Sequence, residues 1–318
     1  MSSLSDYRKC RLCPRVCGID RTAGQVGFCR QTDRMVLACA TRHFGEEPPL
    51  TGVLNNESIS DETGGSGTLF FSGCTLRCGF CQNRQLSRSE VGREITQGEF
   101  VEICLKLQQT GAQNINLVSA TPFIPSVEAG IAAARRSGLR IPIVWNTSGY
   151  ELPEMVERLA GFVDIFLPDL KLLDSRLSGR LFSAKDYPGV AREAILRMVK
   201  LRPVITPHTV SQSGTIVRHL VLPGLLSETL KVLEWFSREV RDRALLSLMV
   251  QFAVPEGGRA TELEDRPLND SEYTRLLEWL DELHIEEGYI QENGKKKMWW
   301  PDFTRHNPFP RDYSKVVW

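Results

Sequence analysis

The sequence lacks an excess of either charge, a long apolar run and paired histidines. Its 39 Lys and Arg balance 39 Asp and Glu, which excludes the strongly basic surface of a general nucleic-acid binder. No apolar run approaches the roughly 18 residues of a membrane-spanning helix, and Met1 to Asp6 carry no apolar signal region. None of the five histidines pairs at helical spacing, so no His-based metal motif is present. We therefore expect a cytoplasmic protein with no nucleic-acid or membrane partner.

Cysteine, in contrast, is abundant and unevenly spaced. There are nine cysteines, and an odd count argues against a disulfide framework. Cys39 and Cys104 stand alone, and Cys104 is expected to be a buried apolar side chain. The other seven form two groups, Cys10, Cys13, Cys17 and Cys29 in the first, and Cys74, Cys78 and Cys81 in the second. Tight groups of cysteines in a reducing compartment indicate metal sites.

Short apolar runs alternate with amphipathic segments along most of the chain. We expect strands at 68–71, 115–118, 141–145, 162–167, 216–222 and 245–252, and helices at 99–109, 125–137, 152–159, 191–201 and 227–240. Strands that alternate with helices indicate a parallel sheet with right-handed crossovers. The pattern predicts an α/β fold, a partial (βα)6 barrel, with its chemistry at the carboxyl ends of the strands.

The chain divides into three expected parts. Residues 1–60 are rich in Cys, Arg, Gly and Pro without a sustained strand or helix period, which predicts a loop-rich, metal-binding extension. Residues 61–260 hold the barrel, and residues 261–318 form a C-terminal helix and an aperiodic tail. The tail carries three lysines, Lys295 to Lys297, followed by Trp299 and Trp300. We expect it to dock over the barrel through aromatic side chains rather than to bind nucleic acid.

The sharpest signal is the segment from Ser72 to Asn83, directly after the first predicted strand. Its C-x3-C-x2-C spacing supplies three thiolates for three irons of a 4Fe–4S cubane and leaves the fourth iron open. A zinc knuckle is the structural alternative, and it requires four ligands in a closed shell. The three-cysteine spacing and the preceding strand favour the cluster.

This motif and its surroundings resemble the radical S-adenosylmethionine (SAM) superfamily between Gly67 and Pro255. Within it, the chain is most similar to activating enzymes of glycyl radical enzymes, particularly to the pyruvate formate-lyase-activating-enzyme-related (PflX-like) branch. The segments that carry the resemblance are Cys10–Cys17, His43–Pro49, Gly67–Phe71 and Cys78–Asn83.

The resemblance implies a radical SAM oxidoreductase whose open iron chelates the amino and carboxylate groups of SAM. One electron from a flavodoxin or ferredoxin-type reductant then cleaves a carbon–sulfur bond, leaving methionine and a 5′-deoxyadenosyl radical. That radical abstracts a hydrogen atom, which in activating enzymes makes a glycyl radical on a partner enzyme. Two alternatives stay open. One is radical modification of another peptide or a small metabolite, and the other is a non-catalytic iron–sulfur or zinc scaffold.

The resemblance also implies SAM-binding positions at the strand ends. Phe80 would pack near the adenine, with an ordinary core aromatic as the alternative. A Ser-Ala-Thr-Pro turn stands where the family has Gly-Gly-Glu, so Ser119, Thr121 or the backbone must bind the SAM amino group. Asn146, Thr147 and Ser148 resemble a turn that binds ribose hydroxyls or the methionine carboxylate, with a capped βα turn as the alternative.

Further site positions follow the later strands. Asp169 and Lys171 alternate after the fourth predicted strand, so their side chains share one face. They are the candidate catalytic and SAM-contacting pair, with a monovalent cation at Asp169 or a solvated ion pair as alternatives. Arg218 matches a family arginine that faces the SAM carboxylate, and Gln251 is expected to face the pocket. His219 would face the other way and be structural.

The first cysteine group, Cys10-x2-Cys13-x3-Cys17 with Cys29, supplies four ligands for a second metal. One interpretation is an auxiliary 4Fe–4S cluster that relays electrons or positions substrate, and the other is structural zinc. Zinc favours two paired C-x2-C knuckles, and only one pair is present here, so iron–sulfur is favoured.

His43, Glu46 and Glu47 form one more candidate group. An imidazole and two carboxylates could ligate a metal, transfer protons or bind a cationic substrate. A salt-bridged loop is the structural alternative.

Overall fold

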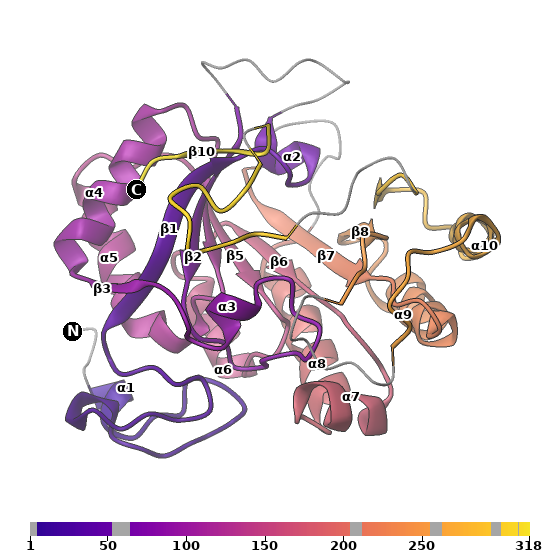
Figure 1. Ribbon diagram of the computed structural model, residues 1–318, viewed down its shortest axis with the longest axis horizontal. Coiled ribbons are helices and arrows are strands. Elements are labelled where there is room, and N and C mark those ends of the chain that lie inside the picture. The colour runs from indigo at the N-terminus through magenta and orange to yellow at the C-terminus, as the bar shows by residue number, and fades with distance from the viewer. Residues whose placement is uncertain (1–4, 53–63, 204–211, 255–262, 294–299, 311) are drawn as a thin grey trace.

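One large sheet organises the fold, and its central strands run parallel. The computed structural model describes residues 5–52, 64–203, 212–254, 263–293, 300–310 and 312–318. The parallel strands are β2 (Ser66–Phe71), β4 (Ile115–Val118), β5 (Ile143–Thr147), β6 (Ile165–Pro168), β7 (Gly214–Leu220) and β8 (Leu245–Met249). Their spatial order equals their order in the sequence, so the sheet grows strand by strand into an open partial barrel (Figure 1). This confirms the predicted fold class.

Antiparallel strands extend the sheet beyond β2. Strand β1 (Met35–His43) pairs with β2 on one side and with β10 (Ser314–Val316) on the other. The short β3 (Arg93–Ile95) also pairs with β1. At the opposite edge, β9 (Gly288–Ile290) lies parallel to β8. The sheet therefore draws strands from both ends of the chain.

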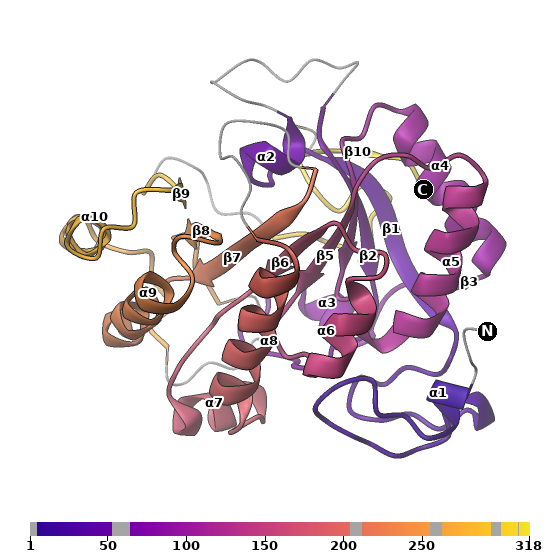
Figure 2. The ribbon, with the colours of Figure 1, turned by 180° about the vertical axis from the view of Figure 1, so that it is seen from behind.

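Helices cover the outer face of the sheet, as the view from behind shows (Figure 2). They are α4 (Gln97–Gln109), α5 (Ile124–Arg136), α6 (Pro153–Leu159), α8 (Tyr187–Leu201) and α9 (Leu226–Glu239). Helix α4 begins with a capping box, in which Thr96 Oγ1 accepts from the Glu99 N–H at 3.1 Å and Glu99 accepts from the Thr96 N–H at 2.8 Å. Its buried face includes Cys104, which is fully buried in the core as predicted.

The inner face of the barrel has an apolar floor. Val144 of β5, Ile216 of β7 and Leu245 of β8 pack there against Leu50, which belongs to α2 (Pro48–Thr51). Side chains alternate along a strand, so Trp145, the neighbour of Val144, packs instead in the outer core beneath the helices. The same alternation decides which polar residues face the barrel interior.

The described N-terminal segment is not purely loop, which corrects one expectation. The prediction of no strand in residues 1–60 is wrong because β1 occupies residues 35–43. Its register shifts between Leu37 and Cys39, and such an irregularity breaks the alternation that marks a strand. The division at residues 60 and 260 stays a prediction, although the central sheet takes strands from all three parts.

Several short elements complete the description. They are α1 (Ser5–Arg8), the 3₁₀ turns Arg21–Ala23 and Thr121–Phe123, α3 (Arg84–Ser87), α7 (Ser175–Phe182) and α10 (Asp270–Glu282). Across the ranges that the structure describes, no helix is both long and apolar enough to span a membrane.

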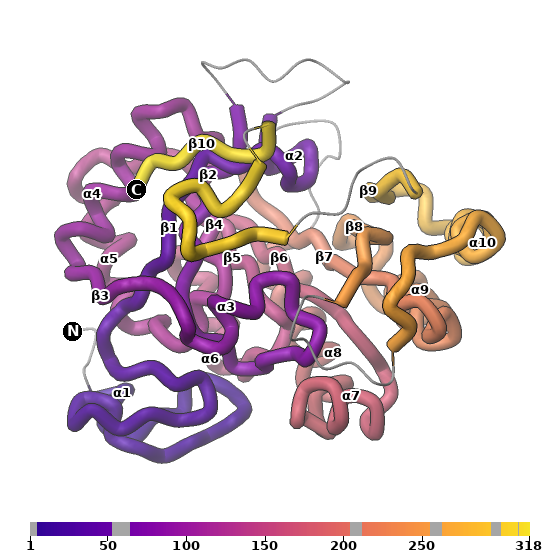
Figure 3. Tube along the Cα trace, viewed as in Figure 1, coloured from indigo at the N-terminus to yellow at the C-terminus, as the bar shows by residue number. Residues whose placement is uncertain are grey.

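The C-terminal tail crosses the open side of the barrel in front of β1 and β2 (Figure 3). Phe303 and Phe309 are 8% exposed and lie in one cluster with Phe70 of β2. Their ring centroids stand 5.5 and 5.1 Å from that of Phe70. Docking through aromatic side chains is therefore confirmed for these two phenylalanines. Trp300 is 36% exposed, and residues 295–297 and 299 lie outside the described residues.

Candidate functional site

The second cysteine group lies on the loop between β2 and α3. Gly73 adopts a φ of 88°, and a Cβ there would come within 2.5 Å of Gln31 Cγ, so the turn requires glycine. The Gly73 N–H donates to Leu86 O at 2.8 Å, and the Gly79 N–H donates to Leu181 O at 3.2 Å. These bonds hold the cysteine loop at the carboxyl end of β2.

Cys74, Cys78 and Cys81 are neighbours that repel one another as thiolates. Burial raises the pKa of the Cys78 and Cys81 thiols; the charges of Cys81 and Cys74 raise that of Cys78 further, and the charge of Cys74 raises that of Cys81. The Leu76 N–H lies 3.4 Å from Cys74 Sγ, and Ser87 hydrogen-bonds Cys81. A set of soft thiol donors on one loop, with Cys78 buried and the other two partly exposed, fits a bound iron–sulfur cluster, which would neutralise this repulsion.

The thiols need not converge on one point for such a cluster. Within the described ranges, no three His, Cys, Asp or Glu side chains come together around a single metal ion. In the predicted cubane each thiolate binds a different iron, so the sulfurs surround the cluster and do not share an ion.

Asp169 and Lys171 lie directly beside the cysteine loop. Lys171 Nζ donates to Asp169 Oδ2 at 2.5 Å, and the two side chains are 15% and 20% exposed. Burial alone would lower the pKa of Lys171, but the nearby Asp169 carboxylate and Cys78 sulfur outweigh it and raise the pKa. The structure thus brings the predicted acid–base pair to the predicted cluster. The Lys171 ammonium is the cation that contacts Asp169, at the position where a monovalent ion was the predicted alternative.

Two side chains fix the backbone of this pair. His219 Nδ1 lies 2.7 Å from Leu170 O and its Nε2 lies 3.0 Å from Thr229 Oγ1. Burial lowers the pKa of His219 to about 4, so the ring is neutral and structural, as predicted. Tyr187 donates to the Asp169 carbonyl at 3.1 Å or to Ser148 O at 3.0 Å, and accepts from the Lys171 N–H at 3.0 Å. Sequence reasoning missed Tyr187, which lies in the first turn of α8.

Thr121 and Thr147 face away from the barrel interior. Both hydroxyls donate to Glu151 Oε1 at 2.6 Å, and Trp145 Nε1 donates to the same oxygen at 3.3 Å. Trp145 and Thr147 share the outer face of β5, because they are two residues apart. The predicted SAM contacts of these two hydroxyls are therefore wrong, since the buried Glu151 carboxyl takes both.

The other predicted SAM positions have mixed surroundings. Asn146 shares the inner face of β5 with Val144 and is partly exposed, as the prediction requires. Ser119 adopts a φ of 60° and donates its N–H to Asn146 O at 3.1 Å, and Ser148 is partly exposed. Phe80 packs edge-on against Phe182 and Phe252 at 6.0 and 5.9 Å, within the core. Gln251 is exposed beyond the end of β8.

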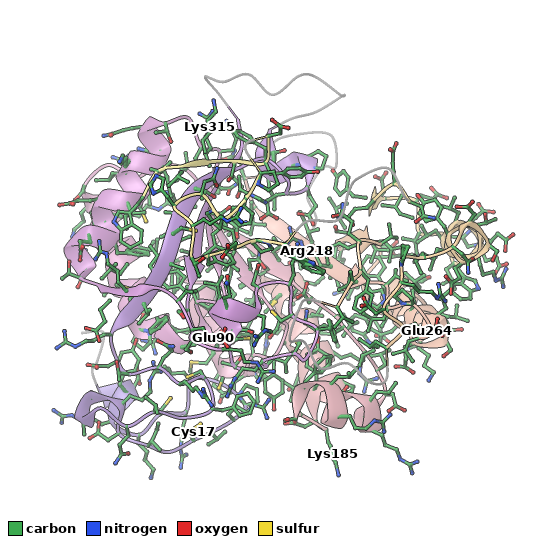
Figure 4. All side chains as sticks on the ribbon, in the orientation of Figure 1. Cys17, Glu90, Lys185, Arg218, Glu264 and Lys315 are labelled. Carbon is green, nitrogen blue, oxygen red and sulfur yellow. The ribbon has the colours of Figure 1, made fainter. Side chains whose placement is uncertain are left out.

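Arg218 pairs with the two glutamates of the His43 group. Its Nε and Nη2 donate to the Glu47 carboxylate at 2.7 and 2.6 Å, and Nη2 also contacts Glu46. Burial alone would raise the pKa of Glu47, but Arg218 outweighs it and lowers the pKa. The predicted alternative of a salt-bridged loop is therefore the one observed. Arg218, which was expected to bind the SAM carboxylate, donates from two of its nitrogens to Glu46 and Glu47 instead. Figure 4 shows Arg218 near the centre of the molecule.

The four N-terminal cysteines line one cavity. Cys10, Cys13 and Cys29 are buried, Cys17 is partly exposed, and all four face the same space. Cys17 lies at the outer part of this unit in Figure 4. A Cβ at Gly27 would come within 2.7 Å of Cys17 Sγ, so glycine keeps room beside the sulfur.

A buried cation accompanies this cavity. Arg21 is 1% exposed and its Nη1 lies 3.8 Å from Cys10 Sγ. The guanidinium also donates to the backbone oxygens of Gln31, Thr32 and Pro122. Four thiolates around a metal carry net negative charge, and a fixed guanidinium offsets it. The donor set therefore fits a bound metal or cluster.

The N-terminal unit contacts the second cysteine loop directly. Arg15 Nε donates to Thr75 O at 2.9 Å, and its other nitrogens donate to the carbonyls of Phe182 and Ser183. Arg77 donates to Phe28 O at 3.3 Å from the opposite side. Arg15 and Arg77 thus join the N-terminal unit to the second cysteine loop by direct hydrogen bonds.

The family follows from a match to known proteins. The family model of the radical SAM superfamily matches residues 68–236, more than half of the chain. The chain belongs to the radical SAM superfamily. This radical SAM protein is 27% identical over 292 residues to an uncharacterized protein of Methanocaldococcus jannaschii, covering 88% of this chain and 76% of the relative.

Three solved structures are similar to parts of this radical SAM protein at low identity and with TM-scores below 0.5. Streptococcus suis SuiB bound to S-adenosylmethionine is 15% identical over 70% of this chain, with a TM-score of 0.49, and the chain spans only 48% of SuiB. Methylornithine synthase PylB is 13% identical over 77% of this chain and 72% of its own, with a TM-score of 0.47. A domain of a Bacteroides vulgatus pyruvate-formate lyase-activating enzyme is 12% identical over 53% of this chain and 93% of its own, at 0.37.

Proposed function

We propose that the protein binds a 4Fe–4S cluster through Cys74, Cys78 and Cys81, cleaves SAM reductively and abstracts a hydrogen atom from a substrate. The observation that carries this is the buried cysteine loop at the carboxyl end of β2 with the Lys171–Asp169 pair beside it. When bound, the cluster and SAM supply one-electron cleavage of a carbon–sulfur bond and a 5′-deoxyadenosyl radical.

The chain's own residues orient SAM and exclude water from it. Lys171 presents a cation toward the cysteine loop, where a carboxylate of SAM is an attractive partner. Asp169, held by Lys171, and Asn146 on the inner face of β5 offer acceptors for hydroxyl or amino groups. Leu76 and Phe80, buried around the loop, keep the region apolar.

The proposed substrate is a backbone glycine of a partner enzyme, which would become a glycyl radical. The support is the similarity of the Cys78–Asn83 and Leu167–Lys171 segments to activating enzymes. The runner-up is another peptide or a small metabolite, and the Ser119–Pro122 turn, which departs from the activating-enzyme pattern, favours it. A flavodoxin or ferredoxin-type protein is the proposed electron donor. If the open iron goes unused, the protein is a scaffold.

We also propose that Cys10, Cys13, Cys17 and Cys29 hold a second iron–sulfur cluster. The shared cavity and the buried Arg21 support a bound, negatively charged metal group. Contact with the other cysteine loop through Arg15 and Arg77 favours a redox cluster over structural zinc, because electrons pass efficiently only between nearby centres. Anaerobically purified protein should then contain about eight irons, whereas about four irons and one zinc would mean a structural knuckle.

Anaerobic reduction in the presence of SAM tests the proposed chemistry. Wild-type protein should release 5′-deoxyadenosine and methionine, and Cys78→Ser should release neither. Cys104→Ser is the matched control, because this cysteine is buried beneath the sheet, away from both groups. Absence of cleavage by wild-type protein under any reductant would leave the scaffold alternative. A glycyl radical signal on a candidate partner would establish the partner substrate.

A further inference from the structure

A layer of polar side chains lies inside the barrel directly above its apolar floor. On three strands the residue two positions beyond a floor residue is polar: Asn146 beyond Val144, Arg218 beyond Ile216, and Ser247 beyond Leu245. Asn116 of β4 faces the same interior, since its neighbours Ile115 and Leu117 pack in the outer core. A polar layer inside a barrel costs solvation energy unless its groups are paired.

The charges of this layer do not balance. Glu46 and Glu47 reach in from the end of β1 and share one guanidinium, that of Arg218. Ser247 adds a hydrogen bond to Glu47. Asp169, the next acid along, is balanced by Lys171. Two carboxylates against one guanidinium leave one net negative charge inside the barrel.

Two buried polar atoms beside these carboxylates have no partner among the described residues. Asn116 is fully buried and donates from Nδ2 to Glu46 Oε1 at 3.3 Å, while its Oδ1 is unpaired. His43 is 8% exposed, and its Nδ1 is unpaired. Burial lowers the pKa of His43, so the ring is neutral at pH 7. The unpaired Asn116 oxygen is an acceptor, and His43 Nδ1 is one too in the Nε2–H tautomer. At a site with excess negative charge they call for a donor that carries positive charge.

The group is within reach of the proposed SAM site. The Glu46 and Arg218 side chains retain 9% and 13% exposure, so solvent reaches them. Asp169 pairs along the backbone with Arg218, and the Leu170 N–H donates to Arg218 O at 2.8 Å. Lys171, on the same segment, faces Cys78. The unbalanced carboxylates therefore contact Arg218 on β7, and the segment that carries Asp169 and Lys171 pairs with β7 directly.

We propose that Glu46, with Asn116 and His43 beside it, binds an ammonium or guanidinium group of the substrate inside the barrel. This inference rests on the proposed function and adds the chemical class of the substrate, a cationic one. A cation with several N–H donors fits because it satisfies Asn116 Oδ1 and balances Glu46 at once. Arg218 binds Glu47 through both Nε and Nη2 and contacts Glu46 through Nη2 alone, so Glu46 has acceptor capacity left for a substrate cation.

Titration calorimetry on anaerobic holoprotein with SAM present tests the cation site directly. The probes are n-butylguanidinium and n-butylammonium chloride, with n-butylurea, which has an uncharged head group, and potassium chloride as comparisons. The three organic probes share one alkyl chain, so the charge of the head group is the compared variable. We expect at least one of the two cationic probes to bind about tenfold or more tightly than n-butylurea. Equal affinity for all three organic probes, or binding of potassium alone, would overturn the proposal.

A variant pair locates the binding. Glu46→Gln keeps the size of the side chain and removes its charge, so it should lose the preference for the cationic probe. Glu282→Gln, on the exposed face of α10, should keep it. If Glu46→Gln does not fold, the wild-type comparison between n-butylguanidinium and n-butylurea still decides. Reductive SAM cleavage by wild-type protein without any probe tests the proposed function separately, so the two can fail independently.

Discussion

Replacing Arg218 by methionine would leave two carboxylates inside the barrel without their guanidinium. The side chains of Arg218, Glu46 and Glu47 are 13%, 9% and 6% exposed, so solvent screens them little. Removing one partner of such a buried ion pair costs about 3–5 kcal/mol, because the remaining charge stays desolvated. Methionine fills much of the volume, so the loss reports charge rather than a cavity. We expect Arg218→Met to reduce the free energy of unfolding by this amount at pH 7.5.

The loss should shrink on acidification. In the wild-type protein Arg218 holds the pKa of Glu47 below its ordinary value. This pair therefore contributes stability that is present above the pKa of an unfolded glutamate and is lost as the pH falls through the lowered folded pKa. In the variant, burial, the largest influence on Glu47, raises its pKa against only the hydrogen bonds from Ser247 and the backbone, so protonation relieves the penalty already in mildly acidic solution.

Neighbouring groups do not reverse this trend. Burial lowers the pKa of His43, and Arg218 lowers it further, so removing Arg218 eases protonation there as well. Burial raises the pKa of Tyr289 to about 12, which keeps it neutral throughout. Asp169 retains Lys171. The difference in stability between variant and wild type should therefore be smaller at pH 5.5 than at pH 7.5.

Urea unfolding of the anaerobic holoprotein, followed by tryptophan fluorescence at both pH values, measures the effect. Arg275→Met is the matched control, since Arg275 also contacts two glutamates, Glu278 and Glu282, but on an exposed helix face. It should unfold at the wild-type urea concentration. A loss below about 1 kcal/mol for Arg218→Met, or an equal loss at both pH values, would refute the buried-charge reasoning.

Three further predictions concern the parts around this centre. Gly27→Ala places a Cβ 2.7 Å from Cys17 Sγ and should lower the metal content of the N-terminal site. Gly189→Ala, which has open space around the new Cβ, should leave it unchanged, and elemental analysis of the two variants measures the difference. Tyr187→Phe removes a buried hydroxyl that holds the backbone beside Lys171 and should cost about 1–3 kcal/mol in urea unfolding, with unchanged stability as the contrary result. Phe309→Ala opens a cavity under the tail and should cost about 3 kcal/mol; a shift in thermal midpoint no larger than that of a surface variant would contradict the docking of the tail.

Much of the fold could be predicted because the central strands are buried on both faces. Such strands read as short continuous apolar runs, and each predicted run overlaps an observed strand. Strand β1 escaped detection because its register shift at Leu37 and Cys39 and its small residues hide the alternation. Strand β10 is three residues long and is a strand only because it pairs with β1. No local sequence pattern predicts that pairing.

The site could be predicted where the spacing of residues along the chain determines the chemistry. It could not be predicted where the chemistry depends on the direction of a side chain. Cys74, Cys78 and Cys81 follow from their separation in the chain. Thr121 and Thr147 stand at the expected strand ends. Their hydroxyls nevertheless bond to a buried carboxyl, that of Glu151, and the sequence does not show this partner. The contact between Arg218 and Glu47 joins residues 171 positions apart, and only the folded partial barrel brings them together.

The pairing of β1 with β10 cannot form until late in the synthesis of the chain. The segment between His43 and Ser314 spans 314 − 43 = 271 residues, which at about 5–20 residues per second takes roughly 14–54 s to translate. Through that interval the edge of β1 beyond β3 has unused backbone donors and acceptors, because Val317 and Trp318 can bond to Ala40 only once they have been synthesised. Strand β3 pairs with Met35 to Leu37, and the remainder of this edge is a template for pairing with other chains. Truncation of the final residues should therefore produce aggregated protein rather than a soluble, weakened one.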